Sequence, residues 1–298
     1  MKNNIKLLDG SMSFPLEKSG YNLKNRLWTG NALIEDPQLI KDIHIGYIKA
    51  GSDYISTSTY QVSCKVLKDL GYNYDEVINI FKNSVNLAKD AIKESKVKKN
   101  IRIVGSFGPY AAYLPNASEF VGLYETTDKE IEEYHYENIE IIKKIELDII
   151  LFETIPCLRE LKILLKLISN LKKEIWLSFT CNEKIMFRDG SSIDEGVKLA
   201  SNYSNITTIG LNCFSPLLVA KGIEKLRYLS NKKILIYPNS GEIYDPIEKE
   251  WNGNNQYNGV MLKEWLRLSP DIIGGCCRVG YDNIKKMREE IDIYLNCK

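Results

Sequence analysis

Short runs of β-branched and other apolar residues alternate with longer segments of helical spacing along the whole chain. This alternation is typical of parallel strands joined by crossover helices. The runs predicted as strands lie at residues 5–8, 54–57, 101–105, 148–152, 175–179, 207–211, 233–237 and 271–274. Helices are predicted near residues 37–50, 75–98, 128–146, 158–172, 193–203, 216–230, 259–268 and 281–296. Eight strand–helix units favour a closed (β/α)8 barrel, or TIM barrel, over an open doubly wound sheet, and nothing marks a domain boundary within residues 1–298.

Charge and composition narrow the class of protein. The chain has 40 Lys and Arg against 39 Asp and Glu, so its net charge of +1 does not favour a nucleic acid or another polyanion as partner. Its apolar runs are short and broken by charges, and its first ten residues lack the apolar core of a secretion signal. We therefore expect a cytoplasmic α/β protein without membrane contact. Its assembly state, monomer or homo-oligomer, is left open.

Polar and small residues directly follow the predicted strands. They occupy positions 9–10, 58–61, 106–110, 153–156, 180–181, 212–213, 238–242 and 275–278. In a TIM barrel the carboxyl ends of all strands converge on one mouth, which is where sites are built. The polar stretch 243–258 is predicted to be a loop over this mouth, and residues 109–127 are a second candidate lid. For both segments an ordinary surface loop is the alternative.

The cysteines give the sharpest chemical signal. There are seven, an odd number that does not indicate a disulfide framework in this context. Cys276 and Cys277 follow two glycines, whose freedom would let the backbone turn so that both thiolates reach one ion. Cys213 at another strand end is the natural third ligand, with Cys157 and Cys181 as competitors. With only two histidines in the chain, three thiolates describe a soft tetrahedral site with one open position, for which zinc is the expected metal. The alternative is that the cysteine pair merely packs as small buried residues.

Seven ordered motifs carry a family resemblance. They are Leu-Leu-Asp-Gly at 7–10, Leu-Trp at 27–28, Gly-Ser-Phe-Gly-Pro-Tyr at 105–110, Phe-Glu-Thr-Ile-Pro at 152–156, Gly-Leu-Asn-Cys at 210–213, Tyr-Pro-Asn-Ser-Gly-Glu at 237–242 and Gly-Gly-Cys-Cys-Arg at 274–278. With these motifs the chain resembles the homocysteine S-methyltransferase family, most of all the enzymes that use S-methylmethionine. The resemblance implies a TIM barrel with zinc held by Cys213, Cys276 and Cys277 and homocysteine sulfur in the open position. A free thiol has a pKa of about 8.5, and coordination to zinc deprotonates it without a histidine base.

Substrate contacts are predicted from the same motifs and from the strand ends. Asp9 and Glu153 are placed to bind the ammonium group of homocysteine, although for Asp9 a cap on the following turn is the alternative. Trp28 is the first choice for the aromatic surface that faces the cationic methyl donor. Asn212 and Ser240 are predicted to hydrogen-bond a substrate carboxylate or loop carbonyls. Further candidates are Tyr60, Tyr110 and Trp251 for the donor, Asn239 for the carboxylate, and Arg278, for which a salt bridge explains the residue equally well.

The predicted function is zinc-dependent methyl transfer from S-methylmethionine, or from S-adenosylmethionine, to the thiol of homocysteine, which gives methionine. The segment 9–17 departs from the pattern of the close relatives. It has Pro15 where they have an acidic residue, and it is more similar to the betaine-using branch. The segment 237–245, together with Trp251, is similar to the S-methylmethionine users. Betaine as donor and selenocysteine as acceptor are therefore alternatives. From other classes, the alternatives are a non-catalytic zinc or thiol sensor with a filled fourth metal position, and a zinc hydrolase.

Overall fold

A computed structural model describes residues 4–114, 118–245 and 250–296. Parts of both candidate lids, residues 115–117 and 246–249, lie outside the described residues, and so does Cys297. Within the described part of the chain, no helix is long and apolar enough to cross a membrane.

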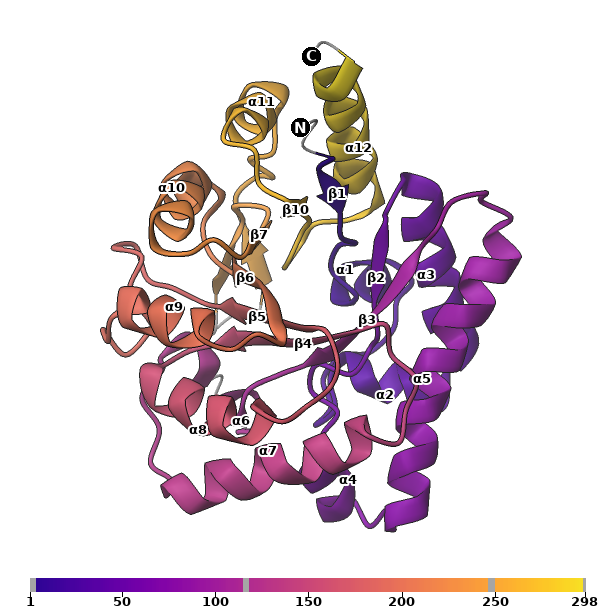
Figure 1. The fold of residues 1–298 in the computed structure, drawn as a ribbon. Helices are drawn as coiled ribbons and strands as arrows, with labels where there is room; N and C mark the ends of the chain where they lie inside the picture. The colour runs from indigo at the N-terminus through magenta and orange to yellow at the C-terminus, as the bar shows by residue number, and fades with distance from the viewer. Residues whose placement is uncertain (1–3, 115–117, 246–249, 297–298) are drawn as a thin grey trace.

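Eight parallel strands form a barrel at the centre of the molecule (Figure 1). They are β1 (Lys6–Leu7), β2 (Tyr54–Ser56), β3 (Arg102–Phe107), β4 (Ile149–Ile155), β5 (Ile175–Phe179), β6 (Ile206–Asn212), β7 (Lys233–Tyr237) and β10 (Ile272–Ile273). The sheet runs in the order β1-β10-β7-β6-β5-β4-β3-β2, and a parallel bridge between Leu8 and Tyr54 joins its two ends. The predicted TIM barrel and its eight strands are confirmed, with β5 and β7 at the predicted bounds.

Helices surround the barrel and connect consecutive strands (Figure 1). The crossover helices are α3 (Pro37–Ala50), α5 (Tyr74–Ser95), α7 (Asp128–Ile142), α8 (Leu158–Ile168), α9 (Ile193–Ser201), α10 (Val219–Leu229), α11 (Gly259–Arg267) and α12 (Tyr281–Asn296). Local chemistry sets their ends: Asn73 and Glu76 form a capping box at the start of α5, and Gly51 ends α3 in the left-handed conformation. The eight predicted helices are therefore confirmed, several of them one to a few residues shorter than expected.

Strand side chains alternate between two apolar layers, one inside the barrel and one under the helices. This alternation decides which polar side chains at the strand ends point into the barrel. On β4, Ile149 and Leu151 belong to the cluster inside the barrel, whereas Ile150 and Phe152 pack in the larger cluster under the helices. The next inward position of β4 is Glu153. The change from apolar to acidic along one face of this strand thus puts a carboxyl group at the mouth.

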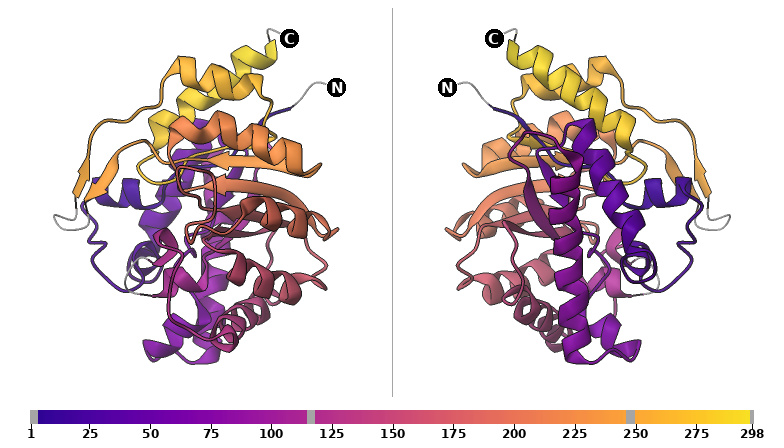
Figure 2. Two further views of the ribbon diagram at one scale, coloured as in Figure 1. Left: turned by 90° about the vertical axis from the view of Figure 1, so that its left-hand side faces the viewer. Right: turned by 90° about the vertical axis from the view of Figure 1, so that its right-hand side faces the viewer.

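Several short elements in the connections were not predicted. They are α1 (Ser13–Lys18), α2 (Thr29–Glu35), α4 (Cys64–Asp69), α6 (Tyr110–Tyr113), η1 (Ser118–Phe120), η2 (Pro216–Leu218) and the antiparallel strands β8 (Ile243–Asp245) and β9 (Glu250–Asn252). The prediction of a plain loop at 243–258 was wrong, because β8 and β9 pair there. This hairpin stands out from the barrel on the side where α1 lies (Figure 2). Each of these strands has only three residues, which is too short to show an alternating pattern in the sequence.

Candidate active site

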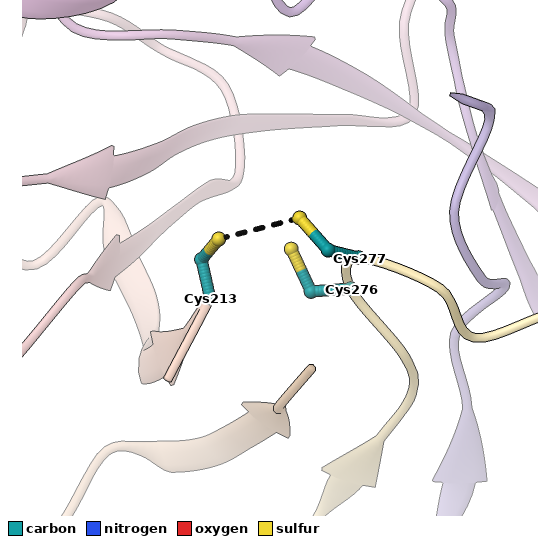
Figure 3. Close-up of side chains that lie close together, drawn as sticks. All are labelled: Cys213, Cys276 and Cys277. Atoms are coloured by element: carbon teal, nitrogen blue, oxygen red, sulfur yellow. Dashed lines mark hydrogen bonds between the residues drawn. The ribbon is translucent and has the colours of Figure 1, made fainter. Parts of the chain in front are cut away.

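Three cysteine sulfurs meet at the mouth of the barrel (Figure 3). Cys213 follows the last residue of β6, and Cys276 and Cys277 lie in the loop after β10. The three sulfurs all lie within 4.8 Å of one another, and the Sγ atoms of Cys213 and Cys277 are 3.6 Å apart. Across the described residues, this is the one group of three or more His, Cys, Asp or Glu side chains with such spacing. The structure thus brings together the three residues that the sequence predicted as metal ligands.

The loop after β7 braces the two cysteine segments against each other. The carbonyl oxygen of Pro238 accepts a hydrogen bond from the Cys276 amide at 2.8 Å, and Asn239 Oδ1 accepts one from the Cys277 amide at 3.1 Å. The amide of Asn239 in turn donates to the carbonyl of Phe214, next to Cys213. The relative position of the two cysteine segments is therefore fixed by hydrogen bonds that do not depend on a bound ion.

The two glycines before the cysteine pair are needed for space. Neither Gly274 nor Gly275 adopts the left-handed conformation, so the turn depends on the space left by their missing side chains. A Cβ atom on Gly275 would lie 2.0 Å from Val279 Cγ1, and one on Gly274 would lie 2.8 Å from the Cβ of Leu8. The chain can turn back over the barrel here only because these positions carry no side chain.

Cys213 is held in an uncommon backbone conformation, with φ at 54°. Its carbonyl oxygen accepts hydrogen bonds from Thr180 Oγ1 at 3.2 Å and from Arg188 Nη2 at 3.0 Å, while Arg188 Nε donates to Thr180 Oγ1. Backbone strain of this kind persists where the surroundings over-determine it, and it is common at functional sites. Sequence reasoning missed Arg188, because only the fold brings residue 188 next to the end of β6.

The chemistry of the three thiols fits a soft metal ion. Contact with Cys213 and then burial raise the pKa of Cys276 well above that of an ordinary thiol. Three adjacent thiolates therefore need a cation between them. The predicted competitors are elsewhere: Cys157 caps α8 through the amide of Glu160, and Cys181 is buried in the outer apolar cluster. The hypothesis of a zinc or thiol sensor requires a fourth ligand, and neither of these sulfurs supplies one.

Two buried carboxyl groups lie at the mouth beside the cysteines. Asp9 accepts hydrogen bonds from the amide of Ser56 at 2.7 Å and from its hydroxyl at 2.9 Å, so it binds the end of β2 and does not cap its own turn. Glu153 accepts hydrogen bonds from the hydroxyls of Ser106 and, at 3.0 Å, of Tyr237. Burial raises the pKa of Asp9 to about 8 and also raises the pKa of Glu153. Within the described residues neither carboxyl group has an ion pair, so each is available to pair with a cationic ligand.

Asn212 and Ser240 are fully buried and already hydrogen bonded within the protein. Asn212 Oδ1 accepts from the Thr154 amide at 3.0 Å and from Ser178 Oγ at 2.7 Å, while its Nδ2 donates to Thr154 Oγ1 at 2.8 Å. This clamp holds Thr154, a β-branched residue, at a φ of 60°. Ser240 Oγ donates to Glu242. Both side chains shape the loops of the mouth, and direct substrate contact stays a prediction for each.

The predicted aromatic residues fall into two groups. Trp28 is half-buried at the start of α2 and packs edge-on against Tyr60, with ring centroids 6.5 Å apart. Tyr60 is close enough to Cys213 and Glu153 for their charges to act on its hydroxyl, so this pair lies at the site. Tyr110, by contrast, is buried in a tyrosine cluster with Tyr134.

Trp251 and Arg278 tie the hairpin to the barrel mouth. The Arg278 guanidinium lies 5.8 Å from the ring centroid of Trp251, and it forms ion pairs with Glu17 at 2.6 Å and Glu242 at 3.5 Å. The salt-bridge interpretation of Arg278 is confirmed. Of the two roles considered for Trp251, this contact supports anchoring the hairpin.

The structure also reveals an acidic residue that sequence reasoning missed. Glu119 in η1 is buried at 4% exposure, and its charge acts on the hydroxyl of Tyr60. The one signal in the sequence was an isolated acid in an otherwise uncharged stretch, 114–123, within the candidate lid. That signal does not distinguish a site residue from an exposed loop residue.

Comparison with known proteins gives consistent similarities over nearly the whole chain. A family model described as homocysteine S-methyltransferase matches residues 6–291. Homocysteine S-methyltransferase YbgG of Bacillus subtilis is 32% identical over 291 residues, which cover 94% of this chain and 92% of that protein. Selenocysteine Se-methyltransferase of Brassica oleracea is 29% identical over 96% of this chain and 88% of that protein. The crystal structure of the metallated form of the homocysteine methyltransferase MmuM from Escherichia coli superposes with a TM-score of 0.85, at 27% identity over 96% of both chains.

Proposed function

The chain belongs to the homocysteine S-methyltransferase family, and we propose that it transfers a methyl group from S-methylmethionine to the thiol of homocysteine. The observation that carries this proposal is the placement of three clustered thiols beside two buried, unpaired carboxyl groups at one barrel mouth. The thiols suit a metal, and the carboxyl groups suit the ammonium of an amino acid. Together they describe a site for a thiol-bearing amino acid.

We infer that the metal is zinc and that Cys213, Cys276 and Cys277 hold it. Three thiolates are a soft donor set of the kind that zinc prefers, and the two histidines lie elsewhere in the fold, on α3 and α7. Bound zinc would lower the pKa of the homocysteine thiol, so that its sulfur is a thiolate at neutral pH. The existence of a metallated form of the Escherichia coli relative supports a bound metal.

Asp9 and Glu153 would bind the ammonium group of homocysteine. Both carboxyl groups are buried and lack a cation in the described part of the chain, and each keeps acceptor capacity beyond its present hydrogen bonds. A buried ammonium needs such partners, because an unpaired buried charge is costly. These contacts would orient the homocysteine sulfur toward the cysteines, since Glu153 lies close enough to Cys276 for its charge to act on that thiol.

Methyl transfer at this site needs no acid or base from the protein. The homocysteine sulfur forms a bond to one methyl carbon of the sulfonium donor as the bond between that carbon and the sulfonium sulfur breaks. The electron pair of the broken bond stays on the departing sulfur, which leaves as a neutral thioether, so no proton has to be delivered. Charge is neutralised along this path, which a site shielded from water favours.

Trp28 and Tyr60 would provide the surface for the sulfonium group. Aromatic faces attract cations through the quadrupole of the ring, and both rings remain partly exposed at the mouth. Tyr60 is held in place by its carbonyl oxygen, which accepts a hydrogen bond from the Gly108 amide at 3.1 Å.

The test is methionine formation by purified, zinc-loaded protein with one donor at a time. We expect the highest kcat/KM with S-methylmethionine, a lower value with S-adenosylmethionine, and none above background with glycine betaine. Turnover with betaine and not with a sulfonium would assign the donor to the other branch of the family. No turnover with any of the three would contradict the proposed function.

Selenocysteine is a second candidate acceptor, favoured by the similarity to the selenocysteine Se-methyltransferase of Brassica oleracea. A selenol would occupy the same position and use the same ammonium contacts. Competition decides between the two acceptors: with both present at equal concentration, we expect homocysteine to yield most of the methylated product.

A further inference from the structure

Glu119 is a buried acid with one carboxyl oxygen that has no hydrogen-bond partner. Its side chain is 4% exposed, and its Oε2 atom is fully buried without a hydrogen-bond partner. Within residues 4–114, 118–245 and 250–296 it has no ion pair either. Burial raises the pKa of Glu119 to about 7. A buried polar group in this condition costs free energy, so a protein that keeps one invites a functional explanation.

A nearby acid shows that this region can satisfy a buried glutamate. Glu160 is completely buried, yet both of its oxygens are bonded: Oε1 to His135 Nε2 at 2.7 Å and to the Tyr110 amide, and Oε2 to the hydroxyl of Tyr124. Glu119 has no equivalent set. The free oxygen of Glu119 is therefore a property of its own position within the candidate lid.

The position of Glu119 is fixed beside the proposed donor surface. Burial is the main cause that raises the pKa of Tyr60, and the charge of Glu119 is the next. The charge of Cys213 raises the pKa of the same hydroxyl. The end of its segment is packed against the mouth, because a Cβ atom on Gly122 would lie 2.5 Å from the amide nitrogen of Asp189. The neighbouring Arg188 binds the carbonyl of Cys213. Glu119 therefore lies near Tyr60, and its segment packs against the one that contacts Cys213.

We propose that Glu119 binds the primary ammonium group of the methyl donor and so selects donors that are amino acids. This inference rests on the proposed function and extends it to donor specificity. A sulfonium has no N–H or O–H to donate, so it leaves the free oxygen of Glu119 unbonded and is better matched to Trp28 and Tyr60. A primary ammonium supplies both the missing donor and the missing positive charge. Asp9 and Glu153 are the corresponding groups for the acceptor.

The same contact would exclude donors that carry a carboxylate but no primary ammonium group, and so no N–H to donate. Glycine betaine and dimethylsulfoniopropionate are of this kind. Each would leave the Glu119 oxygen unpartnered, and a carboxylate placed near it would meet a like charge.

The first experiment varies the donor and leaves the protein unchanged. Zinc-loaded protein is assayed with S-methylmethionine and with dimethylsulfoniopropionate, at saturating homocysteine. We expect kcat/KM for dimethylsulfoniopropionate to be lower by about 100-fold or more, or undetectable, because a charge-assisted bond in a buried site is lost and the like-charge contact adds to the loss. Equal use of both donors would overturn the inference and leave the proposed function intact.

The second experiment changes the residue. We expect Glu119→Gln to raise KM for S-methylmethionine about 10- to 100-fold while KM for homocysteine and zinc content stay within about twofold of wild type. The matched control is Glu125→Gln, which removes one charge from an exposed position of the same segment and is expected to change nothing. Calorimetric titration of S-methylmethionine into the zinc-loaded proteins in the absence of homocysteine gives the same comparison without turnover.

The outcomes separate the two proposals. If wild type turns over no sulfonium, the proposed function fails. If wild type uses S-methylmethionine and Glu119→Gln keeps both its affinity and its preference over dimethylsulfoniopropionate, the inference fails alone. If Glu119→Gln does not fold, the comparison of donors on wild type decides.

Discussion

The two ends of the barrel treat buried charge in opposite ways. At the amino-terminal ends of the strands, Asp53 is buried and fully compensated: it pairs with Lys99 at 2.8 Å, Arg288 at 3.3 Å and Lys6 at 3.8 Å, and accepts a hydrogen bond from the Leu7 amide. At the carboxyl-terminal ends, within the part of the chain that the structure describes, the buried acids Asp9, Glu119 and Glu153 have no cation.

This difference assigns the two ends to different tasks. A compensated buried charge contributes to the stability and register of the strands, and its removal leaves other charges unpaired. An uncompensated one is a cost to the folded state that a ligand of opposite charge can offset. The contrast agrees with the general division of TIM barrels, in which chemistry lies at the carboxyl end of the strands and the other end serves stability.

The largest effect should follow loss of a proposed metal ligand. We expect Cys213→Ser to lower bound zinc to well under one ion per chain and kcat/KM at least about 1000-fold, because the homocysteine thiol would then be mostly protonated. Metal analysis and the methionine assay measure both. Cys181→Ser is the matched control, a buried cysteine outside the cluster that should keep its zinc. Stoichiometric zinc in Cys213→Ser would break the assignment of the mouth as a metal site.

At the opposite end, Asp53→Asn should destabilise the fold and spare the chemistry. Three cationic side chains lose their common partner, so we expect the free energy of unfolding to fall by about 3 kcal/mol. KM for homocysteine should stay unchanged. Denaturant unfolding and steady-state kinetics measure the two quantities. An exposed pair gives the control, since Glu133→Gln next to Lys129 should cost less than about 0.5 kcal/mol.

Two glutamates at opposite ends of neighbouring strands sharpen the comparison. We expect Glu153→Gln to raise KM for homocysteine about 30- to 100-fold, because a charge-assisted bond to its ammonium is lost, without lowering stability. Glu174→Gln breaks the partly exposed pair with Arg102 and should cost about 1 kcal/mol of stability with normal KM. A Glu153→Gln protein that unfolds readily and binds homocysteine normally would mean that the mouth acids are structural after all.

The dependence of stability on pH gives a further comparison. Because burial raises the pKa of Asp9 from 3.8 to about 8, the folded protein binds this proton more tightly than the unfolded chain does between these values. The contribution of Asp9 to stability is therefore favourable at low pH and lost as pH rises toward 8, at no more than about 1.4 kcal/mol per pH unit. Unfolding of the metal-free protein at several pH values should give a steeper fall for wild type than for Asp9→Asn. Identical slopes would show that Asp9 is not held as a protonated acid.

Sequence and structure agree most closely where local patterns decide. The strands 175–179 and 233–237 and the helices 37–50 and 281–296 have the predicted bounds, because apolar periodicity, caps and turn residues act within a few positions of one another. The prediction that the three cysteines lie close together was right for a related reason. Residues that directly follow parallel strands must converge once the strands form a barrel, whatever the details of packing.

What the sequence by itself determined is therefore the architecture, the family and the meeting of Cys213 with Cys276 and Cys277 at the mouth. Only the tertiary structure decided which acids lack a partner and which polar side chains are already used. Glu119 is free and Glu160 is bonded, while Asn212 holds Thr154 in place. The physical reason is that a hydrogen bond or an ion pair is a property of two groups brought together from distant positions, and a sequence pattern specifies only one of them at a time.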